Sequence, residues 1–116
     1  MSRLKEKDSE QVGHHGTVLR ARNQAEAARF VGRPGTIVIV GRASPKWCQF
    51  QCPCGCGDVV ALNLRSEMGR HWRMEVGPTG AISLWPSVVR ETGCRSHFVI
   101  HNGRFLFVRR KPPAKR

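Results

Sequence analysis

The chain has 116 residues, which is enough for one small domain with a modest hydrophobic core. Its net charge is +12, from 20 Lys and Arg against 8 Asp and Glu, so an acidic partner such as nucleic acid has to be considered. No stretch approaches the roughly 18 apolar residues of a membrane span. The charged N-terminus also lacks the apolar run of a signal peptide, so we expect a cytoplasmic protein without a membrane partner.

The basic excess lies at the flanks of the chain. Residues 52–103 are nearly balanced, whereas residues 104–116 contain basic side chains and no acidic one. We therefore expect a flexible N-terminal arm at 1–16, a single zinc-stabilised β-rich domain at 17–108, and a basic disordered tail at 109–116. The basic runs contain few aromatic side chains and the chain has no Tyr, unlike a base-stacking surface.

In chain order, residues 23–31 are the one clear helix candidate, because Asn23 can cap the helix and Gly32 can end it. The run TIVIV at 36–40 predicts a buried strand. Further strands are expected at 47–51 and 58–64, on either side of a loop rich in cysteine.

The second half adds strands at 71–76 and 81–85. A single helical turn is predicted at 86–91, because Pro suits the first turn of a helix. The last element is a hairpin, in which Asn102-Gly103 separates two alternating apolar runs. The predicted fold class is therefore mainly β, α+β with one short helix. It is a small antiparallel sheet domain stapled by a Cys-rich zinc knuckle and ending in an Asn-Gly hairpin.

A two-residue hairpin loop also assigns side chains to faces, since strand residues alternate. It predicts an apolar face that holds Phe98, Ile100, Phe105 and Phe107. His97 falls on the opposite face, away from this aromatic core.

Four cysteines predict a metal site. Cys52, Cys54 and Cys56 stand in a Pro/Gly turn, where they cannot pair with each other without strain, and Cys94 follows far downstream. Thiolates that converge on one ion suit tetrahedral Zn²⁺ in a structural role. The alternative is a loop of reduced, partly buried thiols. Cys48 lies outside the cluster and is expected to be a packed thiol.

His97 has two possible functional roles. It can be a zinc ligand, because its spacing from Cys94 permits this, or a general base beside a metal that four thiolates already complete. The cysteine count favours the general base, and a polar His on a half-solvated strand is the plain alternative.

Ser87 is the best candidate nucleophile for such a base, because backbone N–H groups at a helix start can hold an oxyanion. A simple capping role is its alternative. Ser96 and Ser83 are weaker candidates. Glu91 or Glu75 can complete a triad, although a Ser–His dyad fits equally well.

Several motifs together carry a resemblance: GRPGTIVIV (32–40), the Trp-to-Gly segment 47–57 with CPCGCG, WPS (85–87), the CRSHF segment (94–100) and NGR (102–104). They resemble a family of small bacterial proteins long labelled as a domain of unknown function. Its members are often encoded beside ubiquitin-like, E1-like and E2-like proteins. The resemblance implies a zinc-stabilised β domain in a bacterial ubiquitination-like pathway with an antiphage role. It also implies that the family is the serine protease of such operons, which acts through a Ser–His dyad. The dyad then falls on Ser87 and His97. One departure is Phe107-Val108, where the family is expected to have an aromatic–Cys pair.

Two hypotheses follow. In the first, the chain is a serine-type peptidase that processes or deconjugates a ubiquitin-like protein. In the second, it is a non-enzymatic zinc-binding adaptor that binds nucleic acid or an acidic protein through its basic flanks.

Overall fold

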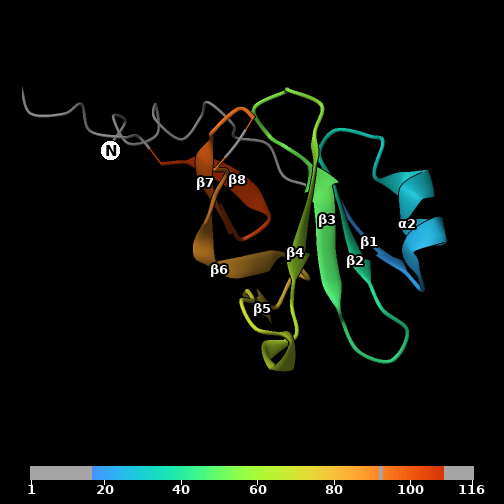
Figure 1. Ribbon diagram of the computed structural model, residues 1–116. Helices are drawn as coiled ribbons and strands as arrows, with labels where there is room; N and C mark the ends of the chain where they lie inside the picture. Colours follow the sequence, from blue (N-terminus) through green and yellow to red (C-terminus); the bar gives the residue numbers. More distant parts are fainter. Residues whose placement is uncertain (1–16, 92, 109–116) are drawn as a thin grey trace, which may run out of the picture.

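A computed structural model of the protein describes residues 17–91 and 93–108, which form two four-stranded sheets and a short helix (Figure 1). The expected arm at 1–16 and tail at 109–116 lie outside these residues. The first sheet has the order β1 (Thr17–Ala21), β2 (Thr36–Val40), β3 (Trp47–Gln51) and β4 (Val59–Asn63). The second has the order β5 (Arg73–Val76), β6 (Ile82–Val89), β7 (His97–His101) and β8 (Arg104–Phe107). The predicted mainly-β class is confirmed, and a 3-10 turn, η1 (Ser66–Met68), links the sheets.

The first sheet contains one pairing that differs from the expected antiparallel arrangement. Strand β1 runs parallel to β2, and helix α2 (Gln24–Phe30) connects them. Strand β1 was not predicted from the sequence. Buried and exposed positions do not alternate along it, so it lacks the pattern by which a half-buried strand is recognised. The helix was predicted, and its cap is confirmed: the Glu26 N–H donates to the Asn23 side chain at 2.9 Å.

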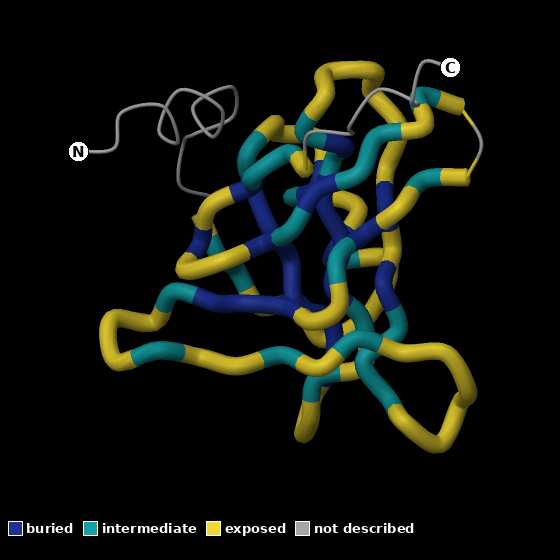
Figure 2. Tube along the Cα trace, turned by 90° about the vertical axis from the view of Figure 1, so that its left-hand side faces the viewer, coloured by how far each residue is buried: buried dark blue, intermediate teal, exposed yellow. Residues whose placement is uncertain are grey.

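Helix α2 covers one face of the first sheet, and the second sheet covers the other face (Figure 1). Strand β2 is consequently buried at every position, which explains its continuous apolar run. Between the sheets, Phe50 contacts Phe98 and Phe105 at ring-centroid distances of 5.9 and 5.2 Å. Figure 2 shows the buried positions gathered in the interior, with exposed positions in the loops. The aromatic core thus joins the two sheets.

The predicted helical turn at 86–91 is wrong, because β6 continues as a strand to Val89. Its register against β7 shifts between the pairs Leu84–Ile100 and Val88–Phe98. Residues 85–87 therefore stand opposite Val99 alone, as a bulge. Pro86, which follows a cis peptide bond, sits in this bulge, where it has no ladder hydrogen bond to lose.

The final hairpin is confirmed. Asn102 and Gly103 have φ angles of 50° and 78°, as the tight turn requires. The pairs run from His101–Arg104 to Phe98–Phe107, so the aromatic face is buried in the core as predicted. No helix in the described ranges is long and apolar enough to cross a membrane.

Candidate active site and metal centre

Ser87 and His97 lie on neighbouring strands and contact each other directly. The Ser87 Oγ atom is 2.8 Å from His97 Nε2. The register pairs Val89 of β6 with His97 of β7, and Ser87 lies two residues before Val89, on the same face. This face points away from the core between the sheets, and both side chains are half-buried. The pair is therefore accessible to a substrate.

Trp72 holds the main chain of the serine. Its indole N–H donates to the Ser87 carbonyl oxygen at 3.4 Å, and its backbone N–H donates to Asn63 of β4 at 2.8 Å. The tryptophan thereby ties the bulge of β6 to the first sheet. No sequence pattern predicted this contact, because it depends on the packing of the loop that precedes β5.

The surroundings of the pair are apolar on one side and charged on the other. Trp85 and Val89 of β6 are 38% and 51% exposed, although both are large apolar residues. Beside His97 is an open hollow of about 490 Å³, which Val89, Arg90, Glu91, Arg95 and His97 line.

The other candidate serines are engaged elsewhere. The Ser96 hydroxyl lies 3.1 Å from the Cys94 sulfur. Ser83 is buried, and its hydroxyl accepts the Asn102 N–H at 2.9 Å. The Glu75 carboxylate faces Arg73 at 3.5 Å. Glu91 lines the hollow, but within the described ranges no carboxylate hydrogen bonds to His97.

The four predicted cysteines come together at one end of the sheets. The Sγ atoms of Cys52, Cys54, Cys56 and Cys94 all lie within 4.8 Å of one another, and His97 is not part of this group. Strands β3 and β4 carry the loop, which the Cys52 N–H closes by donating to the Asp58 carbonyl at 2.8 Å. Gly55 and Gly57 adopt φ angles of 91° and 90°, which favour glycine.

This donor set fits a tetrahedral metal ion. Zn–S bonds of about 2.3 Å place the sulfurs of such a site roughly 3.8 Å apart. In the structure the Cys52 sulfur lies 3.5 Å from that of Cys54 and 3.6 Å from that of Cys94. The four thiols can therefore close around one ion with little movement.

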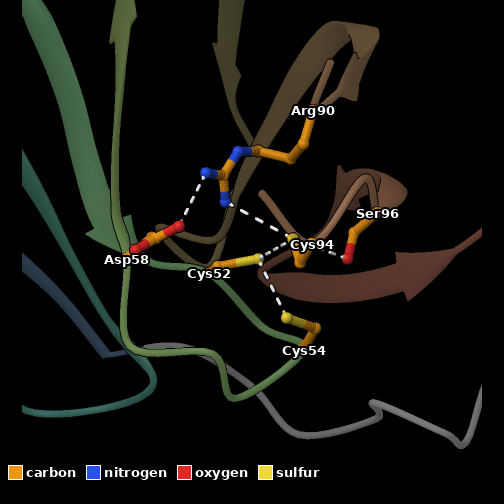
Figure 3. A network of polar contacts seen from close by, with 6 residues as sticks. All are labelled: Cys52, Cys54, Asp58, Arg90, Cys94 and Ser96. Carbon is orange, nitrogen blue, oxygen red and sulfur yellow. Dashed lines mark hydrogen bonds and ion pairs between the residues drawn. The ribbon is translucent and has the colours of Figure 1, made fainter. Parts of the chain in front are cut away.

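The electrostatic surroundings of Cys94 favour its thiolate form. The hydroxyl of Ser96 donates to the Cys94 sulfur and lowers the pKa of this thiol to about 6. The Arg90 guanidinium lies 3.6 Å from the same sulfur and 3.1 Å from the Asp58 carboxylate (Figure 3). Asp58 in turn raises the pKa of Arg90 further, so the guanidinium remains charged.

Sequence reasoning missed three residues of this region: Asp58, Trp72 and Arg90. Asp58 and Arg90 are 32 positions apart, and no spacing links them before the sheets are packed. The nearest signal was the position of Asp58 directly after the cysteine loop, and of Arg90 shortly before Cys94.

A family model described as "Bacterial ubiquitination-like system serine protease (BubE)" matches residues 22–108. No curated protein and no solved structure matches the chain. The matched segment contains both the serine–histidine pair and the four cysteines.

Proposed function

The chain belongs to the BubE family of bacterial ubiquitination-like system serine proteases, and we propose that Ser87 and His97 are its catalytic dyad. The observation that carries this proposal is the 2.8 Å contact between Ser87 Oγ and His97 Nε2 on an accessible sheet face. A nucleophile within hydrogen-bond reach of its base is the arrangement that serine catalysis needs.

In the proposed mechanism, neutral His97 accepts the Ser87 hydroxyl proton at Nε2 while Ser87 Oγ attacks the scissile carbonyl carbon. The tetrahedral intermediate collapses when the protonated His97 gives this proton to the leaving amine. The acyl group then remains on Ser87 as an ester. A water molecule, deprotonated by His97, attacks the ester, and the proton returns to Ser87 as the acid product leaves.

The bulge of β6 supports a new assignment for the oxyanion-binding group, since the helix start expected there does not exist. Residues 85–87 have a single β7 residue opposite them, and a bulge leaves ladder groups without their usual partners. Pro86 has no N–H, so we assign the role of oxyanion donor to the backbone N–H of Ser87 itself.

We further propose that the metal is Zn²⁺ in a structural role. Cys52, Cys54, Cys56 and Cys94 would hold it, and four thiolates leave no open position for substrate. When bound, the ion supplies a fixed crosslink between the β3–β4 loop and the segment that precedes β7. The residues of the chain alone carry out the hydrolysis.

The proposed substrate is the C-terminal tail of a ubiquitin-like protein, either as a precursor or in a conjugate. The family description supports a ubiquitination-like setting. We propose E1-like and E2-like proteins as further partners and the cytoplasm as the place of action. The open sheet face around the dyad suits an extended tail, because such a segment can lie flat along it.

The test is hydrolysis of a ubiquitin-like protein that carries a C-terminal extension and comes from a bacterial ubiquitination-like system. Ser87→Ala and His97→Ala should each lower kcat about a thousandfold or more, and the double variant should be little worse than either single one. Ser96→Ala and Ser83→Ala are the matched controls. Full activity in Ser87→Ala, with loss in either control, would assign the nucleophile elsewhere.

A further inference from the structure

Arg90 connects the metal centre to both strands of the catalytic dyad. It directly follows β6, three positions after Ser87, and its side chain is only 17% exposed. Figure 3 shows its guanidinium between Asp58 and Cys94.

The main chain of Arg90 extends the ladder that holds the dyad. Its backbone N–H donates to the Ser96 carbonyl at 2.8 Å, one step beyond the pair Val89–His97. The position of Arg90 is thus coupled to the start of β7, where His97 lies.

The side chain of Arg90 makes two contacts at once. One terminal nitrogen lies 3.6 Å from the Cys94 sulfur, and the other lies 3.1 Å from the Asp58 carboxylate. Asp58 closes the cysteine loop through its own carbonyl, which accepts the Cys52 N–H at 2.8 Å. A planar guanidinium can bridge two acceptors in this way, whereas a single ammonium group cannot hold the same geometry.

We propose that Arg90 is a positioning residue that transmits the geometry of the metal centre to the Ser87–His97 pair. By contacting the Asp58 carboxylate and the Cys94 sulfur, its guanidinium fixes both the end of β6 and the segment before β7. Groups that hydrogen bond to metal ligands orient those ligands and tune their affinity for the ion. The catalytic part of this inference rests on the proposed function, but the structural link from metal to dyad does not.

The test uses the full chain loaded with Zn²⁺. Arg90→Met should release zinc to a chromogenic chelator about 10- to 100-fold faster than wild type. The ring ¹⁵N signals of His97 in NMR spectra should move toward those of Ser87→Ala, because the contact with Ser87 is loosened. The kcat for the ubiquitin-like substrate should fall by about 10-fold or more, with KM changed less than about twofold.

Two further variants keep the test decisive if Arg90→Met fails to fold. Arg90→Lys retains the positive charge but not the planar guanidinium that bridges two acceptors. Its rate of zinc release and its His97 ¹⁵N signals should therefore lie between those of wild type and Arg90→Met. Asp58→Asn should also speed zinc release and move the His97 ¹⁵N signals toward those of Ser87→Ala. The matched control is Arg42→Met, which removes an exposed arginine on the loop between β2 and β3 and should match wild type in all three measurements.

Wild-type zinc release and wild-type His97 signals in the Arg90 variants would overturn the inference. A rise in KM alone would overturn it as well, because Arg90 would then act as a substrate contact in the hollow beside His97. If the wild-type chain hydrolyses no ubiquitin-like tail, the proposed function fails, and the zinc and NMR readouts still decide the link from Arg90 to the dyad.

Discussion

Cys48 lies on β3 between the two sheets, where its side chain has no exposed surface. Burial raises the pKa of its thiol to about 12, because the charged thiolate has no solvent around it. The expectation of a packed thiol for this residue fits that environment. Its role is to fill the core, in contrast to the four cysteines that converge at the end of the sheets.

This raised pKa predicts a pH dependence of stability. In the folded chain Cys48 keeps its proton up to about pH 12, whereas in the unfolded chain the thiol ionises near its ordinary pKa of 9.0. The contribution of Cys48 to the free energy of unfolding is therefore fully present below about pH 9. It is lost as the pH rises toward 12, by at most about 1.4 kcal/mol per pH unit. Urea titrations at several pH values should show a steeper decline for wild type than for Cys48→Val. Parallel curves for the two proteins would contradict this prediction.

At the scale of elements, the cysteine loop joins β3 to β4, and Cys94 reaches it from the segment that leads into β7. The loop has little apolar surface of its own, since Cys54 and Cys56 are exposed. The proposed zinc ion would therefore add to the backbone turns in fixing its conformation, because metal binding to such a site contributes directly to the free energy of folding.

Cys94→Ser is expected to remove the metal. Elemental analysis of wild type should give one zinc per chain, and the variant should lose it, with a free energy of unfolding lower by on the order of 4 kcal/mol. His97→Ala should keep its zinc, because four thiols already complete the site. The reverse result, zinc kept in Cys94→Ser and lost in His97→Ala, would make the histidine a ligand.

At the scale of the whole molecule, the charge of +12 is unevenly distributed. Residues 52–103, which include Ser87, His97 and the four clustered cysteines, are nearly neutral, and the basic excess lies on either side of them in the sequence. With this arrangement the basic residues are expected to affect the rate of association with a partner. They should affect the rate of the chemical step less, because they lie away from the site. The two sequence-based hypotheses differ in the role of these flanks. In a peptidase the flanks attract an acidic partner, whereas in an adaptor they are the binding surface itself for nucleic acid or an acidic protein.

Deleting residues 111–116 should raise the apparent KM for a ubiquitin-like substrate at low salt and leave kcat nearly unchanged. The difference should shrink at about 0.5 M salt, where the Debye length falls to several Å. Binding to duplex and single-stranded DNA, titrated at about 0.15 M salt, provides the comparison. A dissociation constant below roughly micromolar would favour the adaptor, since non-specific contacts rarely bind more tightly under these conditions.

Local patterns were enough to predict much of the fold. The Asn102-Gly103 turn, the cap at Asn23 and the buried run at 36–40 each depend on neighbours in sequence, and each is found in the structure. The hairpin also assigned His97 to the face opposite the aromatic core, because alternation along a strand needs no tertiary information. The cysteine spacing also predicted that Cys52, Cys54, Cys56 and Cys94 come together, because few other metal-binding side chains lie close to them in the sequence.

The sequence by itself thus determined the mainly-β class, the cysteine cluster and the pairing of the last hairpin. Only the tertiary structure decided that Pro86 lies in a bulged strand, that β1 runs parallel to β2, and that Arg90 bridges Asp58 and Cys94. The reason is physical: local sequence sets turns, caps and strand faces, whereas a bulge and a long-range ion pair exist only once two sheets have packed together. The 2.8 Å contact between Ser87 and His97 depends on that packed register, which brings separate strands side by side.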